Sequence, residues 1–289
     1  MILVTGATGH IGRDLVRELD AKGATFRMLV RDRGRAAGLP ERGERVVGDL
    51  ADPTTLAAAF EGVDHLFLLT QGIGTDYAAH ALAAAKTVGV RHIVFVSSYS
   101  VAPEYLLGKP MPAMARWHHE REEMIRASGI PFTFLRPGGF MTNALDWLPT
   151  VREGYVFDPI GPGRYVPIDP ADIAAVAALV LTADGHQGRA YALTGAEAFT
   201  IAEQVRILAD MVGRDIEVRD ATTPAEAIRS RFPNGAPPAL ADAITEGFRI
   251  MRADTVGFRT DTVPQLLGRP PRTFAEWCAR NASTFQTIA

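Results

Sequence analysis

The sequence predicts an α/β protein in which a doubly wound parallel sheet is followed by a smaller, mainly helical C-terminal lobe. Three observations support this prediction. A glycine-rich turn joins the first strand to the first helix, strand and helix patterns alternate through the first half, and helix-opening patterns dominate the second half. Alternating strands and helices imply right-handed crossovers, which make the strands of the sheet parallel.

The first twelve residues are expected to form a strand, a turn and the start of a helix. Ile2–Val4 has the composition of a buried strand, and glycines follow at the spacing G-x-x-G-x-x-G. Gly6 permits a sharp turn, Gly9 lets the backbone approach a pyrophosphate, and Gly12 lets the helix pack tightly on the strand. The helix N-terminus adds unpaired N–H groups and the positive end of its dipole. We therefore predict a dinucleotide site of the Rossmann type, formed by Gly6, Thr8, Gly9, His10, Ile11 and Gly12. The alternative is an ordinary glycine-containing turn.

The rest of the first half alternates between strand and helix patterns. Strands are expected at Phe26–Val30, Arg45–Val47, His65–Leu69, Ile93–Val96 and Phe132–Leu135. Helices are expected after Gly12 and at Thr54–Phe60, Tyr77–Val88 and Trp117–Ala127. Ligands of such sheets bind outside the carboxyl ends of the strands, where the strand order reverses.

The pattern changes after Pro137, where a glycine- and proline-rich stretch precedes a helix at Asp172–Thr182. Capping boxes then open further helices at Thr200, Thr223 and Thr273, and Gly213 is expected to end one. The predicted domains are an NADP-binding Rossmann domain at residues 1–150, to which residues 169–195 return, and a smaller substrate-binding lobe at residues 151–289.

Composition excludes several classes of protein. A hydrophobic content of 47% allows a sizeable core, and a net charge of -3 argues against a nucleic-acid-binding surface. No apolar run is long enough to span a membrane, and no signal peptide is expected before the first strand. Cys278 is the single cysteine, so no intrachain disulfide is possible and a cytoplasmic location is expected. Cys278 itself reads as a small core residue of a helix.

The end of the second strand distinguishes the two nicotinamide dinucleotides. A carboxylate here accepts bonds from the ribose 2′-hydroxyl of NAD, whereas arginine pairs with the 2′-phosphate of NADP. Arg31 follows the strand directly, Asp32 comes second, and Arg33 and Arg35 are close behind. The cluster favours NADP(H) over NAD(H), while Asp32 leaves NADH open. A solvated charged loop is the alternative interpretation.

Several motifs together resemble the NmrA-like atypical short-chain dehydrogenase/reductase family, and within it bacterial quinone oxidoreductases and triphenylmethane-dye reductases. The likeness covers nearly the whole chain and rests on Thr5-Gly-Ala-Thr-Gly-His-Ile-Gly12, Val30-Arg31, Gly48-Asp49-Leu50, Val96-Ser-Ser-Tyr99, Ser128-Gly-Ile-Pro-Phe-Thr-Phe-Leu-Arg-Pro137 and Leu267-Gly-Arg-Pro-Pro-Arg-Thr-Phe274. The resemblance implies adenine contacts from Asp49 and Leu50. It also implies ribose and phosphate contacts from Leu69, Thr70 and Gln71, a nicotinamide neighbour in Ser97, and a carboxamide frame at Pro137 to Gly139.

Most short-chain reductases pass a proton from the tyrosine of a Tyr-x-x-x-Lys pair. The one such spacing, from Tyr105 to Lys109, contains Gly108 and precedes Pro110, so the two side chains are not expected to share a helix face. The resemblance places the family's lysine position at His118 and its tyrosine position at Met114, so the usual pair is absent.

Two residues are candidates for the missing role. Tyr99, at the end of the fifth strand, could bond a substrate or stack on the nicotinamide. His118 could hold ribose hydroxyls or donate a proton near neutral pH. Simple packing of Tyr99 and a solvated His118 paired with Glu122 are the alternatives. The run from His118 to Glu123 has no metal-site spacing, so no metal is predicted and a solvated helix face is expected.

An apolar, aromatic patch follows the carboxamide loop and suits a flat hydrophobic substrate. Its members are Phe140, Met141, Trp147 and Tyr155. The alternative is that these side chains only seal the lobe onto the sheet.

We therefore expect an NADPH-dependent reductase of a planar conjugated acceptor, such as a quinone, a dye or an aromatic or polyketide ketone. Such acceptors stabilise the charge that follows hydride arrival, which makes a dedicated proton relay less necessary. The expected partner is a hydrophobic aromatic small molecule, with neither nucleic acid nor membrane, and the protein is expected to be a monomer or homodimer. A non-enzymatic NADP(H) sensor that binds a protein partner is the main alternative, and a cyclase or epimerase is a third.

Overall fold

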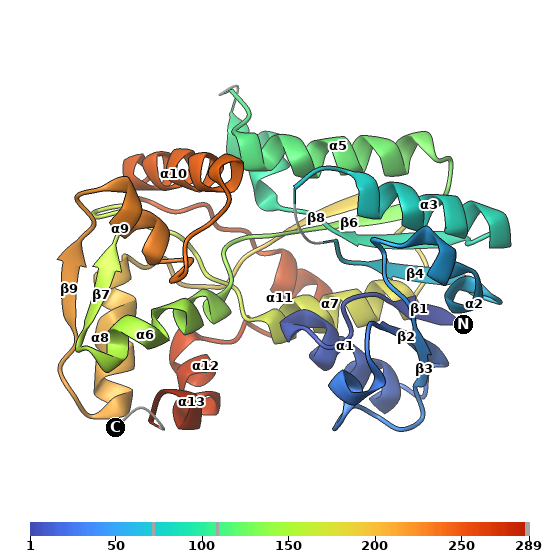
Figure 1. Cartoon of the computed structure of the whole chain (residues 1–289), viewed down its shortest axis with the longest axis horizontal. Coiled ribbons are helices and arrows are strands. Elements are labelled where there is room, and N and C mark those ends of the chain that lie inside the picture. The colour runs from blue at the N-terminus through green and yellow to red at the C-terminus, as the bar shows by residue number, and fades with distance from the viewer. Residues whose placement is uncertain (71–72, 108–109, 287–289) are drawn as a thin grey trace. The chain divides into compact units, whose positions relative to one another are not determined.

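The computed structural model describes residues 1–70, 73–107 and 110–286, which form two compact units (Figure 1). Unit 1 consists of Met1–Leu106, Ala115–Pro137 and Pro170–Ala192. Unit 2 consists of Leu107–Met114, Gly138–Asp169 and Leu193–Ala289.

A seven-stranded sheet with the order β3-β2-β1-β4-β5-β6-β8 forms the centre of unit 1. The neighbouring pairs from β3 to β6 are parallel, with Val4 of β1 opposite both Met28 of β2 and Phe67 of β4. The order reverses between β1 and β4, so the predicted doubly wound parallel sheet is confirmed. Its strands are β1 (Ile2–Val4), β2 (Phe26–Val30), β3 (Glu44–Val47), β4 (His65–Leu68), β5 (His92–Val96), β6 (Phe132–Pro137) and β8 (Arg189–Leu193).

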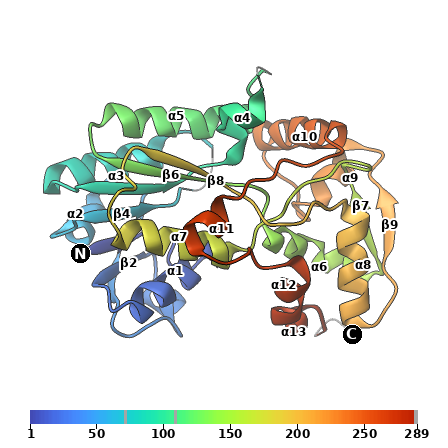
Figure 2. The same ribbon diagram turned by 180° about the vertical axis from the view of Figure 1, so that it is seen from behind.

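Helices cover both faces of this sheet. Figures 1 and 2 show α3 and α5 on one face and α1 beside α7 on the other. α7 is apolar around most of its circumference because it is buried on several sides. The helices of this part of the chain are α1 (His10–Ala21), α2 (Leu56–Phe60), α3 (Asp76–Val88), α4 (Pro103–Leu106), α5 (Ala113–Ala127) and α7 (Pro170–Thr182), with short 3-10 turns η1 (Arg33–Ala36), η2 (Pro53–Thr55) and η3 (Tyr99–Val101).

Unit 2 is mainly helical, as predicted, with one two-stranded parallel sheet formed by β7 and β9. The capping boxes at Thr200, Thr223 and Thr273 are all present, and α8 ends on Gly213 in the left-handed conformation. Cys278 is fully buried in the core. The elements are η4 (Met141–Trp147), α6 (Leu148–Arg152), β7 (Tyr155–Asp158), α8 (Ile201–Val212), β9 (Glu217–Asp220), α9 (Pro224–Arg229), α10 (Pro238–Ala253), α11 (Thr262–Leu267), α12 (Phe274–Arg280) and α13 (Ala282–Gln286).

Some boundaries differ from the sequence-based ones. α1 begins at His10 rather than after Gly12, and α5 begins at Ala113 rather than Trp117. Residues 138–150 belong to unit 2 instead of the first 150-residue domain, because η4 packs Met141 and Trp147 into the core of unit 2. Among the described residues, no helix is long and apolar enough to cross a membrane.

A buried histidine at the start of β5 makes the stability of unit 1 dependent on pH. His92 Nε2 lies 2.9 Å from Thr133 Oγ1, which donates its own proton to the carbonyl of His186 (2.7 Å). His92 is therefore the donor to Thr133 and is held in the Nε2–H tautomer. Burial, reinforced by the neighbouring His65 and His186, lowers the pKa of His92 from 6.5 to about 4.

We expect the free energy of unfolding to fall as the pH drops from 6.5 towards 4. In this range the unfolded chain binds a proton that folded His92 rejects, so the loss attributable to His92 reaches about 3 kcal/mol. Urea unfolding at a series of pH values measures this loss in the free energy of unfolding. His92→Gln should make the profile less steep and leave the part that comes from His118, whose pKa burial also lowers to about 4, whereas His119→Gln, at an exposed position of α5, should leave the profile unchanged. Equal profiles for the wild type and His92→Gln would contradict the assignment.

Candidate cofactor site and active site

The point where the strand order reverses is tied together by Thr5. Its Oγ1 donates to the carbonyl of Phe67 (3.1 Å) and accepts from the N–H of Leu69 (2.8 Å), which joins the carboxyl ends of β1 and β4. Gly6 follows with φ of +66°, and a Cβ there would lie 3.3 Å from Leu69 Cδ2. The turn that starts the predicted pyrophosphate loop therefore needs glycine for both conformation and space.

The N-terminus of α1 has the features of an anion site. Its N-cap is Gly9, and within the described part of the chain no side chain caps it and no acidic residue occupies its first turn. A Cβ on Gly12 would lie 2.1 Å from the carbonyl oxygen of Gly6 and 2.7 Å from Ala7 Cα. Only glycine fits there, so the turn and the helix pack against each other while the first N–H groups stay available for a phosphate.

The arginines after β2 are exposed and lack acidic partners. Among residues 1–70, 73–107 and 110–286, neither Arg31 nor Arg33 makes a side-chain hydrogen bond or ion pair. The carboxylate of Asp32 instead accepts from the N–H of Gly34 (2.9 Å) and caps η1. The guanidinium groups are thus free for an anion, while Asp32 is engaged with its own turn.

The turn after β3 is fixed by local hydrogen bonds. The N–H of Asp49 donates to Thr55 Oγ1 (2.9 Å), and the Asp49 carboxylate accepts from the N–H of Ala51 (3.0 Å). The carbonyl of Leu50 lies 2.7 Å from His80 Nδ1. Asp49 and Leu50, the predicted adenine contacts, therefore lie on a rigid turn.

Three predicted site residues carry buried polar atoms without a hydrogen-bond partner among the described residues: Thr70 Oγ1, Ser97 Oγ and His118 Nδ1. Thr70 and Ser97 follow β4 and β5, which are adjacent parallel strands, so both lie at the carboxyl edge of the sheet. Leaving a buried polar atom unpaired costs about 1–3 kcal/mol, so a bound group that bonds these atoms recovers that energy. Hydroxyls and phosphates of a dinucleotide fit this need.

The two predicted catalytic residues lie in different environments. Burial lowers the pKa of His118 from 6.5 to about 4, so its imidazole is neutral at neutral pH. A neutral imidazole can form a hydrogen bond with a hydroxyl, but it lacks the extra proton that an imidazolium donates as an acid. Tyr99, in η3, is half-buried and packs edge-to-face on Tyr105, with ring centroids 4.5 Å apart.

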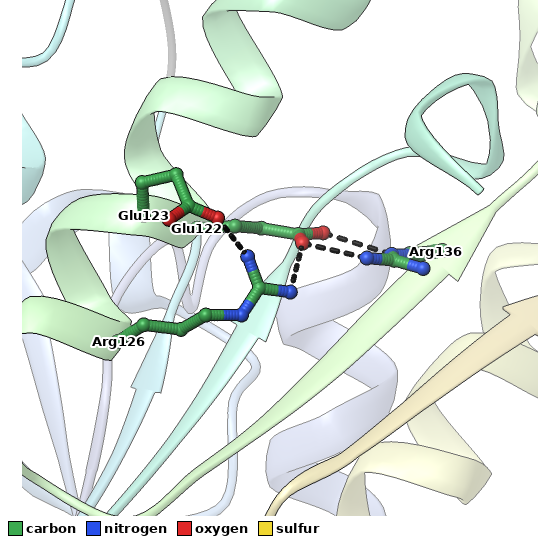
Figure 3. Close-up of polar contacts among 4 residues, drawn as sticks. All are labelled: Glu122, Glu123, Arg126 and Arg136. Carbon is green, nitrogen blue, oxygen red and sulfur yellow. Dashed lines mark hydrogen bonds and ion pairs between the residues drawn. The ribbon is translucent and has the colours of Figure 1, made fainter. Parts of the chain in front are cut away.

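Hydrogen bonds from Arg121 and an ion pair of Glu122 fix α5, the helix that carries His118. Arg121 donates to the carbonyl of Gly74 from Nε (2.8 Å) and Nη2 (2.6 Å), which anchors the loop that follows β4. Glu122 receives a bidentate pair from Arg136 at the end of β6 (2.9 and 2.7 Å). Figure 3 shows the Glu122 carboxylate between Arg136 and Arg126, whose Nη2 adds a bond of 3.0 Å. α5 is thus held to both the β4 loop and β6.

The expectation of a solvated helix face from His118 to Glu123 is wrong for part of this run. Glu122 is 0% exposed and Arg121 is 3% exposed, because each is paired inside unit 1. The predictions from the sequence did not single out Arg136. Its place directly after the apolar run of β6 was a signal for a buried arginine, which needs a carboxylate partner. Among the described residues no group of His, Cys, Asp or Glu is arranged to hold a metal ion.

Comparison with known proteins identifies the family of the chain. Residues 6–184 match a family described as NAD(P)H-binding. The chain belongs to this NAD(P)H-binding family. The NAD(P)H azoreductase of Xenophilus azovorans is 39% identical over 289 residues, which cover 99% of each chain.

Solved structures agree with this assignment. An NADPH-dependent quinone oxidoreductase from Escherichia coli, complexed with NADPH, matches 97% of this chain and 99% of its own with a TM-score of 0.82 and 28% identity. The triphenylmethane reductase of Citrobacter sp., complexed with NADP(H), covers the same shares with a TM-score of 0.79 and, at 24% identity, shows the fold alone. The resemblance to this group of reductases is confirmed, and the chain is an NAD(P)H-dependent oxidoreductase.

The residues that follow β6 form a backbone-paired loop. In unit 2, the N–H of Met141 donates to the carbonyl of Ile168 and the N–H of Ile168 to Gly139, each at 2.9 Å. The N–H of Gly138 donates to Leu193 (2.9 Å). Pro137, the last residue of β6, is buried. The predicted carboxamide frame therefore begins at the end of a sheet strand.

The predicted substrate residues differ in exposure. Met141 and Trp147 are 2% and 4% exposed and pack in the core of unit 2, which gives them a structural role. Tyr155 lies on β7 with the Arg219 guanidinium 4.0 Å from its ring centroid. Phe140 is half-buried. Substrate contact stays a prediction for all four, and the predicted cofactor residue Gln71 lies outside the described residues, as does Lys109.

Proposed function

We propose that the protein uses NADPH to reduce planar conjugated acceptors, such as quinones and azo or triarylmethane dyes. The observation that supports cofactor use most directly is the set of buried polar atoms at Thr70, Ser97 and His118 that have no partner among the described residues, together with a glycine loop suited to a pyrophosphate. The names of the azoreductase and quinone oxidoreductase relatives support the acceptor class.

The residues divide into binding and positioning roles. The N–H groups at the start of α1 bind the pyrophosphate, Asp49 and Leu50 border the adenine, and Thr70 and His118 bond ribose or phosphate oxygens. When bound, the nicotinamide supplies the hydride. Ser97 and Pro137, both in unit 1, orient its ring.

Protonation of the product needs no tyrosine–lysine pair in this proposal. Met114, at the family's tyrosine position, cannot transfer a proton, and His118 is neutral at neutral pH. A quinone that accepts a hydride becomes a delocalised anion, which is stable enough to take its proton from water or from the Tyr99 hydroxyl. A simple ketone forms a localised alkoxide and requires a stronger donor in the site.

The experiment is NADPH oxidation with a panel of quinones, azo dyes, triarylmethane dyes and simple ketones. We expect turnover of at least one conjugated acceptor and none of the simple ketones. If Tyr99 is the donor, Tyr99→Phe lowers kcat, while Tyr105→Phe, which changes its packing neighbour, does not. No turnover across the panel with intact NADPH binding would refute the proposed class of acceptor.

Arg31 is proposed to select NADPH over NADH. A bond between a guanidinium and the 2′-phosphate contributes about 1.5–3 kcal/mol, so Arg31→Ala should weaken NADPH binding roughly tenfold or more. Binding of NADH, which lacks this phosphate, should change little. Calorimetric titration with both cofactors measures the difference, with exposed Arg17→Ala on α1 as control. An equal loss for both cofactors would contradict the assignment.

A further inference from the structure

A cavity of about 580 Å³ that is largely open to solvent lies in unit 2, apart from the residues assigned to the cofactor. Two chain segments form its walls: residues 195–196, after β8, and residues 259–271, which include α11. Its volume is in the range of small-molecule binding sites.

The walls are held by specific contacts rather than by loose loops. The buried Thr194 hydroxyl donates to the carbonyl of Gly195 and accepts from the N–H of Thr260, both at 3.0 Å, which joins the two segments. A Cβ on Gly195 would lie 2.1 Å from the carbonyl oxygen of Pro167, so the chain turns there in close contact. The backbone of the two walls is therefore held in place before binding, which lowers the entropic cost of binding.

Arg259 gives the cavity a cation without a counter-ion. Its one hydrogen bond is long, 3.4 Å from Nη1 to the carbonyl of Ala196, and no carboxylate of the described residues pairs with it. A second guanidinium, that of Arg269, also lines the cavity. Guanidinium groups bind carboxylates, sulfonates and phosphates through paired N–H donors.

The remaining walls suit a flat apolar body. Pro264, Pro270 and Pro271 line the cavity, and their rings are rigid and offer no N–H donor. Asp261 adds an acceptor for a hydroxyl or amino substituent. The combination of one unpaired cation with three proline rings selects a ligand that is both planar and anionic.

We propose that this cavity binds a planar conjugated molecule that carries one anionic group, such as an aromatic sulfonate or carboxylate. The inference rests on the geometry of unit 2 and does not require that the protein turn over any acceptor.

Calorimetry on the full chain, first without NADP⁺ and then with NADP⁺ saturating, tests the proposal. The probes are naphthalenesulfonate, the neutral naphthalenemethanol, and methanesulfonate, which lacks the ring. Naphthalenesulfonate should bind at least about fivefold more tightly than either partial analogue. Arg259→Gln should remove this advantage, and Arg249→Gln, at an exposed position of α10 outside the cavity, should keep it.

Three results would overturn the proposal: no binding of naphthalenesulfonate, equal binding to Arg259→Gln and wild type, or loss of binding when NADP⁺ is added, which would place the probe in the cofactor site. A kinetic arm distinguishes the two sources of such a ligand. If Arg259→Gln raises KM for a sulfonated dye but not for a neutral quinone, the ligand is the acceptor. If both KM values are unchanged while binding is lost, it is an effector.

Discussion

Replacing Glu122 by alanine should lower the free energy of unfolding by about 3–5 kcal/mol. The carboxylate is 0% exposed and bonds Arg136 at two points and Arg126 at a third. Its removal leaves the Arg136 side chain, only 11% exposed, with a charge that neither water nor a carboxylate compensates. Denaturant unfolding measures the loss directly.

Glu123 offers a matched control one residue away. It pairs with the same Arg126, but its side chain is 55% exposed, so Glu123→Ala should change stability by about 0.5 kcal/mol or less. If the two alanine variants lose comparable free energies of unfolding, burial of the Glu122–Arg136 pair does not increase its contribution to stability. Glu122→Gln keeps the shape of the side chain and part of its hydrogen bonding, so its loss of stability should lie between those of the two alanine variants.

The same contact predicts an effect on cofactor binding. Because Glu122 and Arg121 fix α5 between β6 and the β4 loop, they also fix the position of His118. A Glu122→Gln chain that still folds should therefore bind NADPH more weakly than Glu123→Gln.

Local patterns were enough to predict much of the fold. The inner strands of unit 1 are short, largely apolar runs whose residues are mostly buried, as at Ile2–Val4, whereas the edge strands β3 and β8 are partly exposed. Capping boxes such as that at Thr200 depend on residues only three positions apart, so sequence alone specifies them. Sequence spacing likewise placed the glycine loop correctly between strand and helix.

Buried charge was harder to predict because the partner is distant in the sequence. Glu122 and Arg136 are separated by 14 residues, and charge alone indicated solvent exposure. One signal was available: Ala115, Glu122 and Ile125 are spaced on one helical stripe, and all three are buried. The sequence left open whether Trp147 packs in a core or meets a substrate, since long-range packing decides which unit η4 joins.

Gly12→Ala is expected to damage both folding and cofactor binding. The added Cβ would lie 2.1 Å from the Gly6 carbonyl oxygen and 2.7 Å from Ala7 Cα, and both are backbone atoms that cannot move aside by a rotamer change. The turn and α1 must separate, which should cost about 3 kcal/mol of stability and at least about tenfold in NADPH affinity. Denaturant unfolding and calorimetric titration measure the two effects.

Gly247→Ala in α10 separates this steric effect from the helix propensity of alanine. A Cβ there has no heavy atom within 4 Å, so alanine should stabilise the helix by up to about 1 kcal/mol. At Gly12 the same propensity gain is opposed by the backbone overlap, so the two variants should differ in sign. If Gly12→Ala folds and binds NADPH like the wild type, α1 does not need to approach the Gly6 carbonyl so closely. Glycine would then not be required at this position of the pyrophosphate loop.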